Sequence, residues 1–326
     1  MSTAAGGARS SDGAEVRVLV TGATGFIGAE LCVHLLKMGH EVVAVGRSEE
    51  RLERLQAYVP AGRGQFTALP GSLESLRNLP QGVNAVIHAA AVRESEALVS
   101  PALAIETNVG GTVHLLDVAN IAGAQRFILL SSQSIYGKAD PPWREDQRPA
   151  PHGVYALSKY AAEQAVLKRL TEVEPVILRI SRVYGTGLFM RWDELIGRLV
   201  RRASVGQAIE VYGNGLQRMD LVHIRDLAEV IGMLLDYRNT LPNCVYNIGG
   251  GGSVTFHEIA EAVQEAAASA GLEPPTIEMH PEVTPSGPPH LELDISRIRH
   301  DLHWEPRICL RQGIQESFIE QQKHDR

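Results

Sequence analysis

The stretch Thr21-Gly22-Ala23-Thr24-Gly25-Phe26-Ile27-Gly28 decides the fold of this 326-residue chain. It follows a short β-branched run at residues 16–20 and opens a segment with helical periodicity at residues 26–38. A second apolar run follows at residues 41–45. A strand, a glycine-rich turn, a helix and a second strand form a βαβ unit, so the sequence predicts a parallel sheet at its N-terminal end.

The three glycines of this loop suit the binding of a dinucleotide. Gly22 permits the tight turn, Gly25 lets the backbone approach a pyrophosphate, and Gly28 lets the helix pack closely on the sheet. The N-terminus of the helix offers unpaired N–H groups to the phosphates. The position between a strand and a helix favours a nucleotide site over an ordinary glycine-rich turn. The other residues of the loop predicted to contact the cofactor are Thr24, Phe26 and Ile27.

The alternation of strands and helices continues along the chain. Further strands are predicted at residues 85–88, 127–130 and 176–180, and helices at residues 102–122 and 154–170. Beyond residue 180 the elements become shorter, with glycine clusters at residues 185–187, 213–215 and 249–252 and a proline-rich linker at residues 281–289. We therefore expect an α/β Rossmann fold, a doubly wound parallel sheet with a smaller C-terminal substrate-binding domain.

The predicted domain organisation has three parts. Residues 1–14 contain Ala, Gly, Ser and charged residues without an apolar core, which indicates a disordered tail. Residues 15–180 form the NAD(P)-binding Rossmann domain, whose core continues into the second half through short returning segments. Residues 181–326 are mainly the substrate-binding domain.

Composition limits the protein class. The apolar fraction of 44% and the charged fraction of 21% are those of a globular protein. A net charge of -7 gives no general attraction to nucleic acid or to an anionic membrane, and no stretch is apolar enough to span one. The three cysteines, Cys32, Cys244 and Cys309, form no CxxC pair, so no metal site is predicted. We expect a cytoplasmic protein without nucleic-acid or membrane partners.

Tyr155, Lys159 and Ser132 form a candidate set of acid-base groups. The spacing of four residues places Tyr155 and Lys159 on one face of the helix predicted at residues 154–170. A nearby ammonium favours the phenolate form of a tyrosine, and Ser132 supplies a hydroxyl just upstream. A Tyr-x-x-x-Lys pattern alone is common on amphipathic helices, but its position after a dinucleotide loop points to proton transfer coupled to a redox cofactor.

The end of the second predicted strand bears on the choice of cofactor. NAD sites commonly carry an acidic residue there, which binds the adenosine ribose. Here Val45 is followed by Gly46, Arg47 and Ser48. A small residue followed by a cation can accommodate a 2′-phosphate, so the sequence favours NADP over NAD, with Arg47 as a cofactor contact.

The chain resembles the extended short-chain dehydrogenase/reductase family, the NAD(P)-dependent epimerases, dehydratases and reductases that act mainly on nucleotide sugars. The motifs that carry the resemblance run in order nearly from end to end. Besides the glycine loop and Tyr155/Lys159 they are Val86-Ile-His-Ala-Ala-Ala91, Asn108-Val-Gly-Gly-Thr112, Ser131-Ser-Gln-Ser-Ile-Tyr-Gly137, Leu178-Arg-Ile-Ser-Arg-Val-Tyr-Gly185, Val211-Tyr-Gly-Asn-Gly215, Asp220-Leu-Val-His223, Tyr246-Asn-Ile-Gly-Gly250 and Leu302-His-Trp-Glu-Pro306.

The resemblance implies roles for these residues. Tyr155 is the general acid/base, Lys159 holds the nicotinamide ribose and lowers the pKa of the phenol, and Ser132 hydrogen-bonds the reacting oxygen. His88 is expected to be a packed histidine. The further cofactor contacts that the resemblance implies are Leu73, Ala89, Ala90 and Asn108.

Departures from the family pattern bear on the reaction. The 4,6-dehydratases carry an Asp-Glu pair after the catalytic Thr, whereas Gln133 and Ser134 stand here, which argues against dehydration. Arg182 replaces an Asn and Met219 an Arg near the phosphates of the substrate, and Ser72 replaces an acidic residue that commonly contacts adenine. The predicted substrate contacts are Ser132, Gln133, Ser134, Arg182 and Arg218, with Arg191 and Arg198 as weaker candidates.

Several functions remain open at this point. The first is reversible oxidation at a ring carbon, C4, of a nucleotide-activated sugar, as an epimerase or as an NADPH-dependent ketoreductase; the pair Ser132/Ser134 favours the epimerase and Arg47 the reductase. A non-nucleotide ketone is an alternative substrate, and a non-catalytic nucleotide sensor is an alternative function. The resemblance also implies a homodimer formed through the helices at residues 102–122 and 154–170.

Overall fold

The first βαβ unit forms as predicted in the computed structural model, which describes residues 15–59, 64–170, 172–284 and 290–324. The predicted tail at residues 1–14 lies outside these ranges. Strand β1 (Arg17–Thr21) is buried from its second residue onward, and helix α1 (Phe26–Met38) begins directly after the glycine loop. The helix ends because Gly39 adopts a left-handed conformation, φ 98°, from which its N–H bonds the last carbonyls.

Seven parallel strands form the central sheet, in the order β10-β6-β5-β4-β1-β2-β3. The order reverses between β1 and β4, which is where ligands bind in doubly wound sheets. The predicted Rossmann fold is confirmed. The other strands of this sheet are β2 (Glu41–Gly46), β3 (Phe66–Pro70), β4 (Ala85–His88), β5 (Arg126–Ser132), β6 (Glu174–Ile180) and β10 (Val245–Ile248).

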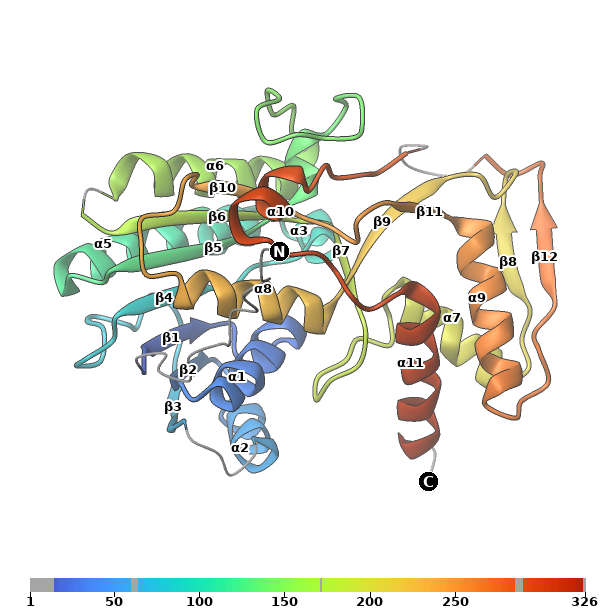
Figure 1. Cartoon of the computed structure of the whole chain (residues 1–326), viewed down its shortest axis with the longest axis horizontal. Coiled ribbons are helices and arrows are strands. Elements are labelled where there is room, and N and C mark those ends of the chain that lie inside the picture. The colour runs from blue at the N-terminus through green and yellow to red at the C-terminus, as the bar shows by residue number, and fades with distance from the viewer. Residues whose placement is uncertain (1–14, 60–63, 171, 285–289, 325–326) are drawn as a thin grey trace, which may run out of the picture.

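Helices cover both faces of this sheet (Figure 1). One hydrophobic core lies between the sheet and the helices α1, α2 and α8, and a second lies between the sheet and the helices α5 and α6. The bounds of the covering helices that follow α1 are α2 (Glu49–Tyr58), α5 (Thr112–Ala122), α6 (Gly153–Arg169) and α8 (Ile224–Asp236).

The smaller part of the fold follows β6 and has its own core, to which α7, α9 and α11 contribute (Figure 1). Two small sheets belong to this part, in the orders β11-β9-β7 and β12-β8. Its elements are β7 (Arg182–Tyr184), α7 (Leu195–Ser204), β8 (Ile209–Tyr212), β9 (Arg218–His223), β11 (Ser253–Thr255), α9 (Phe256–Ser269), β12 (Ile277–His280) and α11 (Leu310–His324).

The helix predicted at residues 102–122 is interrupted. Two short helices, α3 (Glu94–Val99) and α4 (Pro101–Ile105), are followed by the π-helical turn η1 (Glu106–Gly111) and then by α5. Within the turn the Thr112 hydroxyl donates to the Asn108 carbonyl, 2.6 Å away, and the Asn108 side chain points inward. The spacing of apolar residues along 102–122 is that of a continuous α-helix, so it could not predict the wider π-helical turn.

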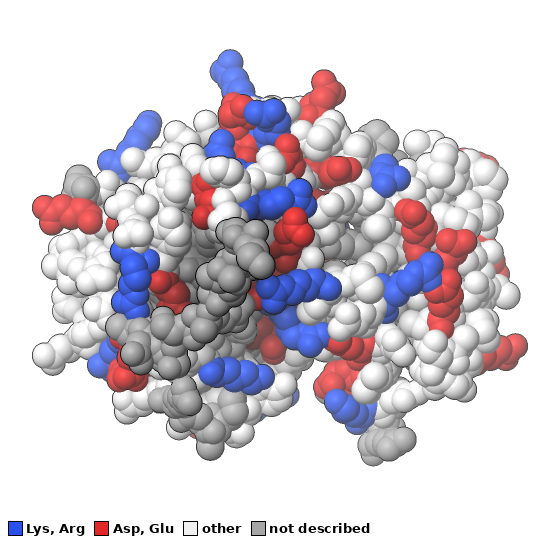
Figure 2. Space-filling view, in the orientation of Figure 1, with Lys and Arg blue, Asp and Glu red and all other residues white. Residues whose placement is uncertain are grey.

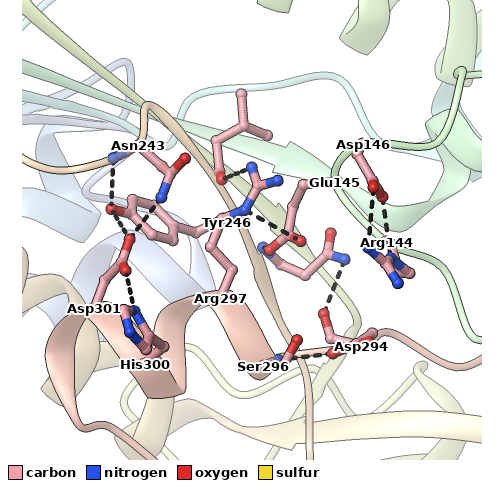
Figure 3. Close-up of polar contacts among 12 residues, drawn as sticks. Arg144, Glu145, Asp146, Asn243, Tyr246, Asp294, Ser296, Arg297, His300 and Asp301 are labelled. Atoms are coloured by element: carbon pink, nitrogen blue, oxygen red, sulfur yellow. Dashed lines mark hydrogen bonds and ion pairs between the residues drawn. The ribbon is translucent and has the colours of Figure 1, made fainter.

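Helix α10 (Ser296–Leu302) returns to the central sheet and fastens the C-terminal segment to β10 (Figure 3). The Asp301 carboxylate accepts from the Asn243 amide at 2.7 Å and from the Tyr246 hydroxyl at 3.0 Å. Arg297 donates to the Val245 carbonyl at 3.0 Å. These contacts place a segment far along the chain beside the edge strand of the sheet.

Candidate active site

A cleft of about 1840 Å³ opens at the carboxyl ends of the central strands and extends to the smaller part of the fold. It has the position expected for the ligand site of a doubly wound sheet. The predicted cofactor contacts that line it are Gly22, Thr24, Gly25, Phe26, Ile27, Gly28, Arg47, Leu73, Ala89, Ala90, Tyr155 and Lys159. The predicted substrate contacts Ser132, Gln133, Ser134, Arg182 and Arg218 line it as well.

The glycine loop has the close backbone approaches that a dinucleotide site requires. A Cβ atom on Gly28 would lie 2.2 Å from the Gly22 carbonyl oxygen, and one on Gly22 would lie 2.7 Å from the Ala90 backbone nitrogen. Gly22 also has a φ of 70°, which disfavours a side chain. The small residues let the N-terminus of α1 and the ends of β1 and β4 come together, so the loop fits a pyrophosphate.

Ser132 and Tyr155 meet at the carboxyl end of β5. Ser132 is the last residue of this strand, and Tyr155 lies in the first turn of α6. The Ser132 hydroxyl lies near the Tyr155 phenol, whose pKa it lowers, and accepts the Ser134 N–H at 3.2 Å. The Tyr155 ring packs against the small cluster formed by Val92, Ala97 and Ala104. The predicted hydroxyl and phenol are therefore brought together at the cleft.

Burial raises the pKa of Tyr155 to about 12, the Ser132 hydrogen bond lowers it, and the charges of Glu94 and Glu194 raise it further. The Lys159 ammonium donates to the Leu130 carbonyl at 2.6 Å, and the lowering of the phenol's pKa by Lys159 stays a prediction.

Lys159 is buried at 4% exposure, and this burial lowers its pKa to about 8. The Glu163 carboxylate, one turn further along α6, acts in the opposite direction. Glu163 is itself held by Arg179 at 2.9 Å and by the Ser131 hydroxyl at 2.5 Å. With a pKa near 8, Lys159 keeps its positive charge at neutral pH, next to the cleft.

The segment between Ser132 and Tyr155 is held by contacts with the edge strand β10 and with helix α10. Trp143 stacks on Tyr136 with ring centroids 5.4 Å apart, and the Tyr136 hydroxyl donates to Asn247 at 2.7 Å. Glu145, two residues after Trp143, accepts the Asn247 N–H and pairs with Arg297 at 3.6 Å (Figure 3). Strand β10 and helix α10 thus hold the loop that leads into α6.

Three residues that line the cleft have a buried polar atom with no hydrogen-bond partner within the described part of the chain. These atoms are Gln133 Oε1 and Ser134 Oγ, just after β5, and Ser181 Oγ, just after β6. Because a buried polar atom without a hydrogen bond is costly, these groups fit a role in binding the polar atoms of a ligand.

The arginines predicted to contact the substrate differ in how firmly other protein groups hold their side chains. Arg218 is held by Ser253, whose Oγ lies 2.9 Å from its Nε. Arg182 is exposed and pairs loosely with Glu194, 3.9 Å away. Of the weaker candidates, Arg191 lines the cleft and pairs with Asp193 at 2.6 Å, whereas Arg198 is not among the lining residues.

Asn108 lies behind the wall of the cleft and does not line it. Its amide oxygen accepts the Val92 N–H at 2.7 Å, and its amide nitrogen donates to the Val92 carbonyl and to Ser158. It therefore fixes the backbone beside Ala90 and the start of α6. His88 is buried between Thr21 and Thr112, 2.8 and 3.0 Å from their hydroxyls, as expected for a packed histidine.

Some lining residues had no motif that could single them out. Arg51 lines the cleft from the first turn of α2. The sequence pattern used to predict the cofactor covers only the residues directly after β2, so it did not include Arg51. Arg201, Tyr212 and Phe256 come from three separate elements of the smaller part of the fold. Only the tertiary structure brings them to the cleft.

On the face of the molecule shown in Figure 2, acidic and basic side chains are interspersed. Among the described residues no group of three or more His, Cys, Asp or Glu side chains is arranged to hold a metal ion. In the same ranges no helix has the length and hydropathy needed to cross a membrane.

Comparisons with known proteins agree with this geometry. The model of the NAD dependent epimerase/dehydratase family matches residues 18–249. UDP-glucuronic acid decarboxylase 1 of Arabidopsis thaliana is 28% identical over 308 residues, which are 92% of this chain and 68% of that protein. A dTDP-glucose 4,6-dehydratase of Streptomyces niveus is 27% identical over 93% of this chain and 91% of its own.

Among solved structures, MoeE5 in complex with UDP-glucuronic acid and NAD is similar with a TM-score of 0.79 and 29% identity. The match covers 95% of this chain and all of MoeE5. Its fold therefore includes both the central sheet and the smaller C-terminal part.

The prediction of NADP over NAD is wrong. The family is described as NAD dependent, and MoeE5 was solved with NAD. The local geometry gives the reason: the Ser48 side chain accepts the Arg51 N–H at 3.2 Å and caps α2, so it is not free for a phosphate. Arg47 is exposed, and the residues after Ser48 are the carboxylates Glu49 and Glu50, which would repel a 2′-phosphate.

Proposed function

Because this chain belongs to the NAD dependent epimerase/dehydratase family, we propose that it inverts C4 of a nucleotide-activated sugar by reversible oxidation, with Tyr155 as the acid/base. It is an enzyme of the extended short-chain dehydrogenase/reductase type, as the resemblance indicated. The relatives named above act on UDP- or dTDP-sugars, which supports a sugar nucleotide as the substrate.

The observation that carries the proposal is the set of side chains at the end of β5. Ser132 reaches the phenol, and the next two positions are the neutral Gln133 and Ser134, whose oxygens have no partner among the described residues. A dehydration needs a strong acid and base beside the sugar ring, and neither an amide nor a hydroxyl provides them. Oxidation at C4 needs only Tyr155 and hydrogen-bond donors around the ring.

The protein supplies proton transfer, orientation and positive charge. The glycine loop would hold NAD, which would supply a reversible acceptor for the C4 hydrogen and its electron pair. The Tyr155 phenolate takes the proton of the 4-hydroxyl as C4 becomes a carbonyl, and Ser132 donates to the same oxygen. After the sugar has turned over, Tyr155 gives the proton back. Because each electron and proton is returned, no external reductant is used.

Lys159 has two tasks in this proposal. Its ammonium holds the nicotinamide ribose. Its charge also favours the phenolate of Tyr155, the form that accepts the proton of the 4-hydroxyl. A pKa of about 8 keeps it charged at neutral pH. Burial alone favours the neutral phenol, which cannot accept a proton, so the phenolate that takes the proton of the 4-hydroxyl depends on this charge.

The ketoreductase alternative loses its main support, because it depended on Arg47 and NADP. Oxidation at C4 is retained in the epimerase, and the unpartnered Ser134 hydroxyl suits a ring that must be held on either face. Gln133 and Ser134 occupy the positions where a dehydratase has carboxylates, so the site has no acid-base pair there to eliminate water from the oxidised sugar.

The test is to incubate the purified protein with UDP-glucose, UDP-glucuronic acid and dTDP-glucose in turn, without added NADH, and to identify the products by NMR. We expect the C4 epimer of at least one of them and no net formation of NADH. A 4-keto-6-deoxy sugar, a pentose formed with loss of CO₂, or a stoichiometric demand for NADH with a keto sugar would contradict the proposal.

A further inference from the structure

The loop between β7 and α7 lies across the cleft and contacts several of its walls. It begins at Gly185, and in Figure 1 it descends beside α1 and α2 before the chain enters α7. On the side of α1, the Glu30 carboxylate accepts the Leu188 N–H at 3.1 Å. Gly187 lies so close that a Cβ atom on it would be 2.3 Å from the same carboxylate. The loop is therefore seated on the first helix of the cofactor-binding half.

Phe189 extends this contact to α2. Its ring is buried at 6% exposure within the core that includes Leu52 and Leu55 of α2. The Arg51 guanidinium lies over the ring, 4.0 Å from its centroid, a distance at which a cation–π contact is favourable. Phe189 and Arg51 both line the cleft. This pair thus connects two segments 138 residues apart in sequence at the wall of the cofactor cleft.

The far end of the loop is held by charges. Arg93, at the start of α3, lies 3.6 Å from Glu194 and 4.0 Å from Asp193. Arg191 pairs with Asp193 at 2.6 Å within the loop. The segment 187–194 is thus fixed to α1 and α2 at one end and to α3 at the other, with lining residues along its length.

We propose that Arg51 and Phe189 form a clasp over the cofactor end of the cleft, so that the dinucleotide is released only after this pair separates. The charge of Arg51 adds a second role, because Arg51 lines the same cleft as the glycine loop, where a pyrophosphate is expected. An enzyme that returns its electrons to the same sugar benefits from slow release, since a cofactor lost after the first half of the reaction leaves a keto sugar behind.

The inference rests on NAD binding and not on the epimerase reaction. It is tested by loading the full-length protein with NADH and measuring the rate of NADH release by fluorescence, in the absence of any sugar nucleotide. Phe189→Leu keeps an apolar side chain in the core but removes the ring, and Arg51→Met keeps the length of the side chain but removes its charge. We expect each change to accelerate release about tenfold.

Three variants serve as controls. Arg54→Met removes a second guanidinium 5.5 Å from the same ring, but Arg54 is exposed and does not line the cleft, so its release rate should stay within about twofold of the wild type. Phe189→Trp retains an aromatic ring and should restore slow release. Arg51→Lys retains the charge without the planar guanidinium and should give an intermediate rate.

The release rates of these variants decide whether the pair acts as a clasp. Unchanged release from folded Phe189→Leu and Arg51→Met proteins would overturn it, and so would equal acceleration by Arg54→Met. A failure of Phe189→Trp to restore slow release would also count against it. If the wild type retains NADH and the variants release it faster, the clasp stands even if no C4 epimer is ever found; a wild type that binds no NADH would overturn both proposals.

Discussion

At the scale of single residues, Tyr155 shows how strongly its surroundings decide its chemistry. Burial raises its pKa to about 12, the Ser132 hydrogen bond lowers it, and Glu94 and Glu194 oppose deprotonation. The phenol is therefore a poor base before a substrate hydroxyl and a cofactor complete the site. This environment suits a proton that must leave and return within one catalytic cycle.

We expect Tyr155→Phe to reduce kcat by about 10²- to 10⁴-fold, because the variant keeps the ring but loses the transferable proton. Affinity for NAD should change little, since the glycine loop is untouched. The matched control is Tyr160→Phe, which removes a phenol hydroxyl from the same helix and should retain activity. Steady-state kinetics and NAD titration check both variants, and a fully active Tyr155→Phe protein would exclude the assigned role.

Glu94 offers a test of the electrostatics at the phenol. Its carboxylate is exposed at the start of α3 and raises the pKa of Tyr155. Removing a negative charge stabilises the phenolate, which is the form that accepts the substrate proton, so Glu94→Gln should lower this pKa and move the ascending limb of kcat/KM to lower pH. Because solvent screens an exposed charge, we expect a shift of roughly a few tenths of a pH unit.

Glu96→Gln is the control for that profile. Glu96 also lines the cleft, but its carboxylate pairs with the Arg93 guanidinium at 2.9 Å, which offsets its charge. Its pH profile should match that of the wild type. A Glu94→Gln profile that moves to higher pH would contradict the electrostatic account.

Residues with a local motif could be predicted to reach the cleft, and residues without one could not. The glycines and Ser132 line it because they lie at the carboxyl ends of strands, and Tyr155 and Lys159 line it because they lie one turn apart on α6. The cofactor choice failed because Arg47 was interpreted without the helix cap formed by Ser48.

At the scale of elements, the junction of β1 and α1 depends on Gly28. A Cβ atom there would meet the Gly22 carbonyl oxygen at 2.2 Å. The position of a Cβ atom is fixed by its own backbone, and the oxygen is a backbone atom, so neither can rotate away. We expect Gly28→Ala to push α1 off the loop, to weaken NAD binding at least tenfold and to lower the free energy of unfolding by about 1–3 kcal/mol. Isothermal titration and urea denaturation measure the two effects.

Gly110→Ala is the matched control. A Cβ atom on Gly110 has no neighbour within 4 Å among the described residues, and the residue is helical. The same chemical change there should leave NAD binding unchanged and should not lower stability, since alanine favours a helix over glycine. Equal losses in both variants would show that the close approach at Gly28 is not the cause.

The elements themselves were largely predictable, with instructive exceptions. The strands lie within a few residues of their predicted positions, because buried parallel strands are short apolar runs between turn signals. The interruption of residues 102–122 by a π-helical turn was missed, since it depends on the tertiary contacts of Asn108 with Val92 and Ser158. A hydrophobic period does not record such contacts.

At the scale of the whole molecule, the cleft lies between the central-sheet part and the smaller part of the fold, and the chain crosses between these two parts more than once. Strand β10 and helix α10 return to the central sheet from the second half, and the loop after β7 contacts α1 and α2. The general fold followed from the alternation of strands and helices. The side chains that the smaller part contributes could not be predicted, because their loops and short strands carry no fixed spacing.

Exposed apolar side chains favour the predicted homodimer. Leu103 and Ile105 on α4, within the predicted segment 102–122, are 41% and 48% exposed, and Leu157 on the adjacent α6 is 50% exposed. We propose that these helices pair with those of a second copy, since burying such side chains is favourable. Leu157→Glu should convert a dimer into a monomer in light scattering after gel filtration.

The control for the dimer is Val205→Glu, which places the same charge at a residue 69% exposed beyond α7. It should leave the mass unchanged. A wild-type protein that is monomeric at all accessible concentrations would contradict the proposed dimer, and so would loss of dimers in both variants.

The most direct test of the central claim follows the hydrogen at C4. The substrate found in the NMR screen is prepared with deuterium at C4 and converted by the wild-type protein in ordinary water without added NADH. We predict that the epimer carries the deuterium at C4, because the hydrogen removed from that carbon returns to it. Deuterium at C6 of a 4-keto-6-deoxy product, or deuterium accumulated in released NADH, would contradict the account.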